Sequence, residues 1–294
     1  MRILITGATG FTGRHLISKM QAAGHVCLAL RSNLTNIEAL RSDVASCGPV
    51  DAVVHLAGIS FVGHSDNAAF YSVNTVGTSN LLEVLASTAL QAGRPPVRVL
   101  IASSANVYGN CENSPIAENQ PPAPVNHYAA SKLAMEHMAL TFSDHLQIVI
   151  ARPFNYTGPG QTPPFLIPKI VDHFVRRADV IELGNLHVER EFNDVRMVCE
   201  AYLGLLAHGA PGQIYNVCTG RPHTLQSVLD TLTELTGHHL NIQVNPELVR
   251  TNEVHSLSGN PDRMHACLGP LTQYDLKDTL LAMMGNGFDA PHQS

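Results

Sequence analysis

The sequence predicts an α/β protein with a Rossmann-type, doubly wound parallel sheet and a smaller C-terminal lobe. Two observations lead to this fold class. Short apolar runs alternate with helical stretches through the first half of the chain, which is typical of parallel sheets covered by helices. In addition, a glycine-rich turn joins the first apolar run to the first helical stretch, as it does in nucleotide-binding folds.

The expected strands and helices of this sheet follow one another along the chain. Five apolar runs predict its buried strands: 2–7, 25–31, 51–58, 97–104 and 146–153. Stretches rich in helix-forming residues predict helices, the clearest of them at 12–23, 68–92 and 127–143. This alternation predicts parallel strands, because a crossover helix returns the chain to the same end of the sheet.

The composition changes after the fifth apolar run. The segment NYTGPGQTPPFL is rich in Pro and Gly and predicts a loop. Residues 168–178, 198–209 and 224–237 predict helices. We therefore expect residues 1–153 to form mainly the sheet domain. Residues 154–294 should form mainly a ligand-binding lobe, from which some segments return to the sheet.

Composition limits the class of protein. The chain has 294 residues, 45% of them hydrophobic and 14% charged, which suits one large α/β domain or two smaller ones. Its formal charge is −6 without a basic run, which argues against nucleic acid or an anionic membrane as a partner. No apolar run reaches the ~18 residues of a membrane span, and the N-terminus lacks the apolar region of a signal peptide. The six cysteines form no CxxC pair and the histidines are scattered, so we expect reduced thiols, no metal site and a cytoplasmic location.

The glycine-rich turn ITGATGFTGRHL lies between the first expected strand and the first expected helix. Its glycines, Gly7, Gly10 and Gly13, are spaced three apart. In dinucleotide-binding folds such glycines allow a tight turn, close approach of the pyrophosphate and close helix–strand packing. A glycine-rich turn alone is weak evidence, but the strand–turn–helix context is the one that the motif requires. We therefore predict that this turn, with Phe11 and Thr12 between the glycines, binds a dinucleotide.

The end of the second expected strand indicates which dinucleotide is bound. An acidic residue there would bond the ribose 2′-hydroxyl of NAD, but the position holds Arg31, whose cation suits a 2′-phosphate. Because Arg31 could also be a solvent-facing residue, we predict NADP(H) and keep NAD(H) as the alternative. Asp43, beside Val44, is expected to contact the adenine amino group. The HLAG segment is expected to bring its backbone close to the cofactor at Leu56, Ala57 and Gly58.

The helical segment NHYAASKLAME places Tyr128 one turn before Lys132, on the same face of the helix. Many chains contain such a pair by chance, with the Tyr at the edge of the core and the Lys in solvent. A free phenol has a pKa of about 10, and a nearby cation favours its ionised form. The pair could therefore exchange a proton with a substrate oxygen near neutral pH.

Several motifs occur in order at the expected intervals: TGATGFTG, HLAG, SSANVYG, YAASK and RPFN. Together they resemble the extended short-chain dehydrogenase/reductase family of nucleotide-sugar enzymes, over nearly the whole chain. The segments RPFNYTGPGQ, EREFNDVRMVCEAY, YNVCTGR and VRTNEVHSLSGNPDRM are similar to the GDP-4-keto-6-deoxy-D-mannose reductases, which make GDP-D-rhamnose. The resemblance implies an NADP-dependent reductase of a GDP-sugar, with a nucleotide-sugar-binding lobe in the second half. It also implies a homodimer, whose interface would contain four helices from around 68–92 and 127–143 of the two copies.

The resemblance also implies roles for three residues. Tyr128 would be the general acid that protonates the C4 oxygen as hydride reaches the carbon. Lys132 would stabilise the tyrosinate and bind the nicotinamide ribose, and Ser104 would donate a hydrogen bond to the same C4 oxygen. Ser103 is the alternative candidate for this hydrogen-bond donor. Strand alternation points the two serines to opposite sides, and the family spacing to Tyr108 selects Ser104.

One position departs from the related sugar-nucleotide 4,6-dehydratases. In those enzymes the segment that matches SSANVYG carries a Glu two residues before the Tyr, and this Glu removes the C5 proton. Here the position holds Asn106. An amide is not a base, so we predict that this protein lacks the elimination step.

The expected substrate contacts lie in the second half. Arginine bonds phosphate oxygens well, and Arg190 and Arg250 match family positions that clamp the diphosphate. For each Arg the alternative is a surface ion pair, since Arg190 lies between two glutamates. Asn155 is expected to contact the diphosphate or sugar, and Glu253 to read the N–H edge of guanine.

Two other functions remain open. A UDP-hexose 4-epimerase, or a related nucleotide-sugar epimerase, would use the same Tyr, Lys and Ser with tightly held NAD, but the missing acid after the second strand argues against it. A non-catalytic NADP-binding sensor belongs to a different class, and such proteins often lack the Tyr or the Lys that this chain has. The sequence leaves the configuration of the product at C4 open.

Overall fold

The structure is a computed structural model that describes residues 1–91, 93–111, 113–186, 188–246 and 256–285. Its centre is a six-stranded parallel sheet with the strand order β10-β5-β4-β3-β1-β2. The strands are β1 (Arg2–Thr6), β2 (Val26–Ala29), β3 (Ala52–His55), β4 (Val97–Ala102), β5 (Leu146–Pro153) and β10 (Ile214–Val217). The strand order reverses between β1 and β3, and doubly wound sheets bind ligands outside the carboxyl ends of strands at such a point.

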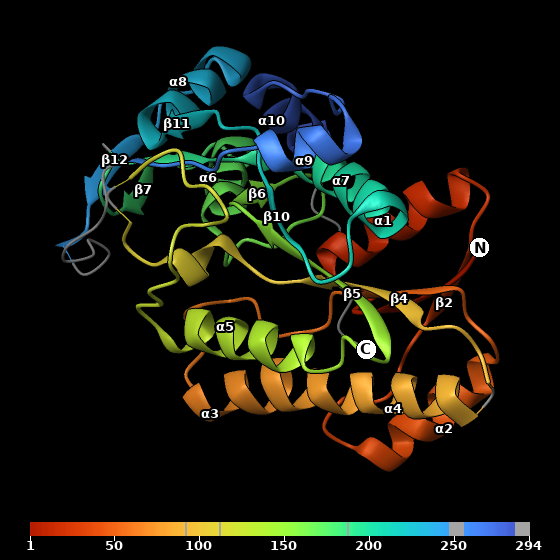
Figure 1. The fold of residues 1–294 in the computed structure, drawn as a ribbon. Helices are drawn as coiled ribbons and strands as arrows, with labels where there is room; N and C mark the ends of the chain where they lie inside the picture. The colour runs from red at the N-terminus through yellow and green to blue at the C-terminus, as the bar shows by residue number, and fades with distance from the viewer. Residues whose placement is uncertain (92, 112, 187, 247–255, 286–294) are drawn as a thin grey trace.

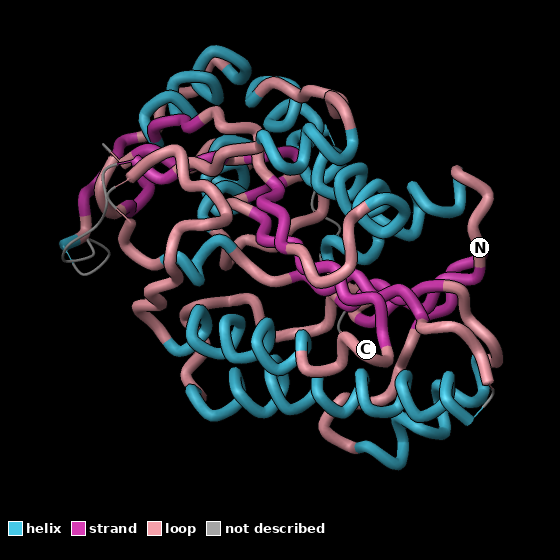
Figure 2. The backbone as a smooth tube through the Cα atoms, viewed as in Figure 1, coloured by secondary structure: helices cyan, strands magenta, loops and turns pink. Residues whose placement is uncertain are grey.

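Helices cover both faces of the sheet, whose strands run through the middle of the molecule in Figure 2. One face is covered by α1 (Phe11–Ala22) and α7 (Val195–His208). The other is covered by α2 (Ile37–Cys47), α4 (Gly77–Gln91) and α5 (His127–Leu140) (Figure 1). The short helix α3 (Asn67–Phe70) leads into a π-helical segment, η1 (Tyr71–Val76), which continues into α4. Each face therefore has its own apolar core.

A smaller lobe lies beyond the carboxyl edge of the sheet and has a third apolar core. Its helices are α6 (Leu166–Val175), α8 (Leu225–Thr236) and α10 (Leu276–Gly285), whereas α9 (Asp262–Leu268) packs in the first core against α7 and β10. Its short strands pair as β7 (Val180–Leu183) with β12 (Asn241–Val244), β6 (Tyr156–Thr157) with β9 (Asn193–Asp194), and β8 (Glu189–Glu191) with both β11 (Pro222–Thr224) and β13 (Ser256–Leu257). These strands carry the segments in which we expected substrate contacts.

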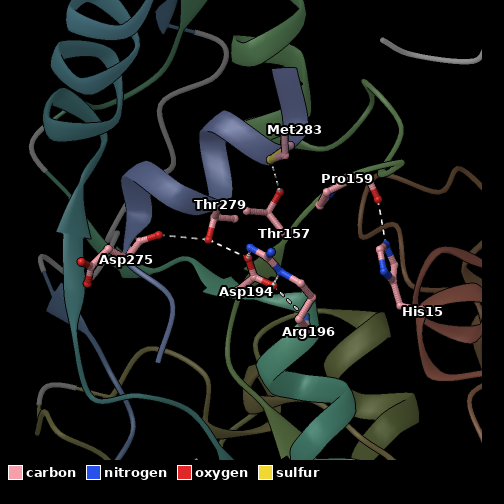
Figure 3. Close-up of polar contacts among 8 residues, drawn as sticks. All are labelled: His15, Thr157, Pro159, Asp194, Arg196, Asp275, Thr279 and Met283. Carbon is pink, nitrogen blue, oxygen red and sulfur yellow. Dashed lines mark hydrogen bonds and ion pairs between the residues drawn. The ribbon is translucent and has the colours of Figure 1, made fainter. Parts of the chain in front are cut away.

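Polar contacts join this lobe to the helices on the sheet (Figure 3). Asp194 caps the start of α7 and forms an ion pair with Arg196, with 2.7 Å between Oδ2 and Nη2. Thr279 of α10 donates a hydrogen bond to the same carboxylate at 2.8 Å. On α1, His15 Nε2 lies 2.8 Å from the carbonyl oxygen of Pro159. The smaller lobe therefore meets the helices on the sheet at the start of α7 and along α1.

The predicted fold class is confirmed. All five expected strands are present, although β2 and β3 are shorter than their apolar runs because the residues that follow leave the sheet as loops. The second half returns to the sheet through β10 and α7, while the division of the chain near residue 153 stays a prediction. No helix in the described ranges is long and apolar enough to cross a membrane.

Candidate active site

Helix α5 presents one polar face to the carboxyl edge of the sheet. Asn126 caps the helix by accepting a hydrogen bond from the amide of Ala129 at 2.9 Å. Tyr128, Lys132 and Glu136 then follow at intervals of one turn, and all three are buried. The structure therefore brings the expected phenol and ammonium together and adds a carboxylate that the sequence analysis did not include.

Ser104 meets Tyr128 from the end of β4. Ser104 is the N-cap of the 3₁₀-helix η2 (Ala105–Tyr108), and its hydroxyl lies near the phenol of Tyr128, whose pKa it acts to lower. Its Oγ accepts two hydrogen bonds from Asn106, one from the backbone N and one from Nδ2, each at 3.2 Å. A hydroxyl oxygen has two lone pairs, so Ser104 is left to act as a donor. Burial raises the pKa of Tyr128, which keeps the phenol protonated at neutral pH.

Lys132 lies one turn after Tyr128 on the same face of α5. Its Nζ donates a hydrogen bond to the carbonyl oxygen of Ala102 at 2.9 Å. Burial lowers the pKa of Lys132 to about 8, against the opposing effect of the Glu136 carboxylate. The ammonium is therefore mainly charged at pH 7 and can lose its charge in mildly alkaline solution.

A buried ion pair fixes the position of Glu136. Arg152 on β5 bonds both carboxylate oxygens, with Nε to Oε1 at 2.9 Å and Nη2 to Oε2 at 2.5 Å. Ser103 donates a hydrogen bond to Oε1 at 2.5 Å. Ser103 is thus engaged in this ion-pair network while Ser104 faces Tyr128, which supports the choice of Ser104 over Ser103.

The glycine-rich turn has the shape that a pyrophosphate requires. Gly7 has a φ of +68°, and a Cβ there would lie 2.8 Å from the amide nitrogen of Ala57. A Cβ on Gly13 would lie 2.2 Å from the carbonyl oxygen of Gly7. Helix α1 begins with no side-chain cap and no acidic residue in its first turn. Because the first amides of a helix lack intrahelical acceptors, Phe11, Thr12 and Gly13 offer N–H donors to an anion.

A buried hydrogen-bond chain sets the conformation of the HLAG segment. Thr6 Oγ1 accepts from the amides of Leu56 at 3.2 Å and Ala57 at 3.0 Å. The same oxygen lies 2.7 Å from Nδ1 of His55, whose Nε2 lies 2.8 Å from the hydroxyl of Thr78. Burial, with the charge of Lys132 nearby, lowers the pKa of His55 to about 3, so the imidazole is neutral. This chain holds the loop after β3 against the glycine-rich turn.

Asn74 in the π-helical segment η1 fixes the next residues of this loop. Its Oδ1 accepts from the amide of Ile59 at 2.8 Å, and its Nδ2 donates to the carbonyl of Ile59 and to the hydroxyl of Ser131. A Cβ on Gly58 would lie 2.8 Å from Oδ1 of Asn74 and 3.4 Å from Nζ of Lys132. The HLAG backbone therefore lies next to the catalytic candidates.

The expected adenine contacts of Asp43 and Val44 receive no support from the geometry. Both residues lie on α2, and the side chain of Val44 is packed in the core between α2 and the sheet. Asp43 Oδ2 accepts hydrogen bonds from the amides of Arg31 and Ser32, each at 2.8 Å. Asp43 thus shapes the loop after β2, while Arg31 is exposed at the strand end, as a 2′-phosphate ligand would be.

The expected substrate residues are placed only in part. Asn155 is exposed between β5 and β6, and its carbonyl accepts from the backbone of Asn193 at 2.9 Å. Arg190 on β8 is partly buried and donates to the carbonyl of Glu189 at 2.7 Å. Arg250 and Glu253 lie outside the described residues.

Glu191, next to Arg190, is a buried structural residue that the sequence analysis treated only as a neighbour. Its Oε2 accepts from the amide of Thr219 at 2.8 Å, and its Oε1 accepts from the amide of Gly259 at 2.6 Å. Burial raises the pKa of Glu191, and these hydrogen bonds act in the opposite direction. The carboxylate therefore joins β8 to two other segments beside the candidate substrate residues.

Comparison with known proteins identifies the family. Residues 3–218 match the model of the NAD dependent epimerase/dehydratase family. The chain belongs to this family. Among its curated members, the GDP-6-deoxy-D-talose 4-dehydrogenase of Aggregatibacter actinomycetemcomitans is 34% identical over 274 residues, which is 92% of each chain. The GDP-6-deoxy-D-mannose reductase of Pseudomonas aeruginosa is 34% identical over 301 residues, or 97% of this chain and 96% of the relative.

Solved structures of the epimerase/dehydratase family have the same fold. The structure of RMD from Pseudomonas aeruginosa complexed with NADPH is 33% identical, with a TM-score of 0.88 over 97% of this chain and 98% of the other. A protein of known structure from Burkholderia cenocepacia J2315 is 42% identical, with a TM-score of 0.89 over 97% of each chain. The expected family is thereby confirmed.

Proposed function

We propose that this protein reduces the C4 ketone of GDP-4-dehydro-6-deoxy-D-mannose with NAD(P)H and forms GDP-6-deoxy-D-mannose, also called GDP-D-rhamnose. The observation that carries the proposal is the arrangement of Ser104, Tyr128 and Lys132, with Asn106 where an eliminating enzyme needs a base. Two relatives that are 34% identical over nearly the whole chain are named for reactions of GDP-6-deoxyhexoses.

The geometry supports a role for each of these residues. When bound, the reduced nicotinamide supplies the hydride. Tyr128 is protonated at neutral pH and gives its proton to the C4 oxygen as negative charge develops there. Ser104, whose lone pairs are occupied by Asn106, donates a hydrogen bond to the same oxygen. The ammonium of Lys132 stabilises the tyrosinate that remains.

The choice of NADP(H) rests on the end of β2. Arg31 is exposed there, and the amides of the loop are held by Asp43. The Pseudomonas aeruginosa structure was solved with NADPH, which supports the same cofactor for this chain. The pyrophosphate would bind the amides at the start of α1, and Leu56, Ala57 and Gly58 would line the site from the other side.

In this proposal Arg190 and Arg250 bind the diphosphate of the substrate, Asn155 contacts the diphosphate or the sugar, and Glu253 binds guanine. A homodimer through η1, α4 and α5 is part of the same proposal. Exposed apolar side chains on η1 and α4 support it, because Val76 is 52% and Leu90 is 62% exposed. Cytoplasmic location stays a prediction.

The decisive experiment gives the purified protein GDP-4-keto-6-deoxy-D-mannose with NADPH, and separately GDP-mannose with NADP⁺. We expect NADPH consumption in the first reaction and no 4-keto-6-deoxy product in the second. NMR of the product then gives its configuration, because 6-deoxytalose and 6-deoxymannose differ only at C4. Conversion of GDP-mannose would overturn the assignment and require another residue as the C5 base.

A further inference from the structure

Tyr156 of β6 lies on the glycine-rich turn although 144 positions separate it from Thr12. Its hydroxyl lies 2.8 Å from Thr12 Oγ1. Its ring stacks on Phe11, with the centroids 6.1 Å apart and the planes at 17°. Both its ring and its hydroxyl are therefore fixed against the start of α1.

The two hydroxyls have one more proton than their mutual hydrogen bond uses. Each carries one O–H, and the described residues offer neither hydroxyl another hydrogen-bond partner. A phenol is a stronger donor and a weaker acceptor than an aliphatic hydroxyl, so Tyr156 donates to Thr12. Burial raises the pKa of Tyr156 to about 12, so the phenol keeps its proton. The O–H of Thr12 is then the one that needs an acceptor.

The surroundings of Thr12 define what that acceptor must be. Thr12 is the second residue of α1, between amides that have no intrahelical acceptor, and the first turn contains no acidic side chain. The amides of this first turn and the phenol of Tyr156 are donors, so an anionic oxygen is a complementary partner for them and for the Thr12 hydroxyl. In a protein that binds a dinucleotide at this turn, the pyrophosphate supplies such an oxygen.

We infer that Tyr156 is a cofactor-positioning residue, which orients the Thr12 hydroxyl so that Thr12 donates to a pyrophosphate oxygen of the bound dinucleotide. This inference rests on the proposed function, since it needs a dinucleotide at the glycine-rich turn. Hydrogen bonds arranged in series polarise one another, so the phenol strengthens the donor that touches the phosphate. The second half of the chain thereby contributes to the cofactor site.

The loop that carries Tyr156 is also held by contacts that do not use its hydroxyl. His15 Nε2 lies 2.8 Å from the carbonyl of Pro159 (Figure 3), and Arg14 donates to the carbonyl of Gly160 at 3.2 Å. Tyr156→Phe keeps the stacked ring and these contacts, so the variant removes only the O–H. This variant therefore tests the hydrogen bond from Tyr156 to Thr12 and its effect on the proposed bond from Thr12 to the pyrophosphate.

The experiment measures dissociation constants by calorimetry for three probes: NADPH, 2′-phospho-ADP-ribose, and adenosine 2′-phosphate, which lacks the pyrophosphate. For the first two probes we expect Tyr156→Phe to weaken binding by about 3- to 10-fold and Thr12→Val by about 10- to 100-fold. Adenosine 2′-phosphate should bind all variants equally. Thr12→Ser keeps a hydroxyl and should stay near wild type, as should Tyr202→Phe, which alters a buried phenol of α7.

The double variant separates positioning from a general effect on the fold. In the Thr12→Val background, Tyr156→Phe should cause no further loss, because the hydroxyl that it orients is gone. In the Thr12→Ser background the loss should persist. Unchanged NADPH affinity in Tyr156→Phe, an equal loss for adenosine 2′-phosphate, or a full further loss in the double variant would each overturn the inference. Failure of the wild-type protein to bind NADPH would instead refute the proposed cofactor itself.

Discussion

Asn106 donates two hydrogen bonds to one oxygen atom, the hydroxyl of Ser104. Both lone pairs of Ser104 are used, so its proton points away from Asn106 and toward Tyr128. In the proposed reaction, the residue at the position of the dehydratase base therefore directs the Ser104 O–H toward the substrate oxygen.

Asn106→Asp should therefore impair the reaction. The Nδ2 donor becomes an acceptor, and the Ser104 proton can turn to the new carboxylate. We expect kcat to fall about 10- to 100-fold, as when one oriented donor is lost at a transition state, with little change in the KM for the sugar nucleotide. Asn106→Ala, which keeps the backbone hydrogen bond, should lose less. Equal kcat values for wild type and Asn106→Asp would show that Ser104 is oriented by something else.

Tyr128→Phe should remove the proton donor and leave the fold intact. General acid–base catalysis typically contributes about 10²- to 10⁴-fold, and kcat should fall by that factor while NADPH binding is retained. Tyr71→Phe is the matched control, because Tyr71 is partly exposed and its hydroxyl lies 3.1 Å from Nδ1 of His127. Near wild-type turnover in a folded Tyr128→Phe protein would exclude Tyr128 as the acid.

The activity should fall in mildly alkaline solution. Burial lowers the pKa of Lys132 to about 8, so the ammonium that stabilises the tyrosinate is charged below that pH and neutral above it. A plot of kcat against pH should show a falling limb near pH 8. The pKa of Tyr128 is raised above its usual value of 10, so its own ionisation lies at higher pH. Lys132→Arg keeps its charge and should lack this limb. A limb that persists in that variant would assign it to another group.

Arg31→Asp should shift cofactor preference toward NADH, because a carboxylate repels the 2′-phosphate and suits a 2′-hydroxyl. The measurement is the ratio of kcat/KM with NADPH to that with NADH. Arg94→Asp makes the same charge change just before β4, at the amino ends of the parallel strands and therefore on the side of the sheet away from Arg31. This control variant should leave the ratio unchanged. If the two variants behave alike, Arg31 does not read the phosphate.

Arg190→Ala should weaken GDP binding and spare NADPH binding. A hydrogen bond to a charged group contributes about 1.5–3 kcal/mol, which corresponds to roughly a 10- to 100-fold loss of affinity. Calorimetry with GDP tests this, and Arg176→Ala, on the exposed side of the same lobe, is the control. Wild-type GDP affinity in Arg190→Ala would show that Arg190 does not bind the diphosphate.

Local patterns predicted the features that depend on neighbours in the sequence. The glycine spacing describes one turn, and the interval between Tyr128 and Lys132 describes one helix. Both features could therefore be predicted from the sequence. The partners of Glu136 could not be predicted, because Arg152 reaches it from β5 and Ser103 from the residue that follows β4. The hydrogen bonds of Asp43 could not be predicted for a related reason. Asp43 lies on α2, and its carboxylate reaches back to the amides of Arg31 and Ser32 in the loop after β2. Tyr156 was overlooked because its contact with Thr12 exists only once the two halves of the chain have folded together.

The π-helical segment Tyr71–Val76 changes the direction in which successive side chains point between α3 and α4. A π turn contains one residue more than an α turn, and each residue of an α-helix advances the direction of its side chain by about 100°. Deleting one residue between Asn74 and α4 to restore regular winding would therefore swing this amide away from Ile59 and Ser131, while the apolar face of α4 kept its register. The π-helical turn therefore allows one continuous helix to direct its apolar residues to the sheet and Asn74 to the loop after β3, although regular α-helical winding would not align both.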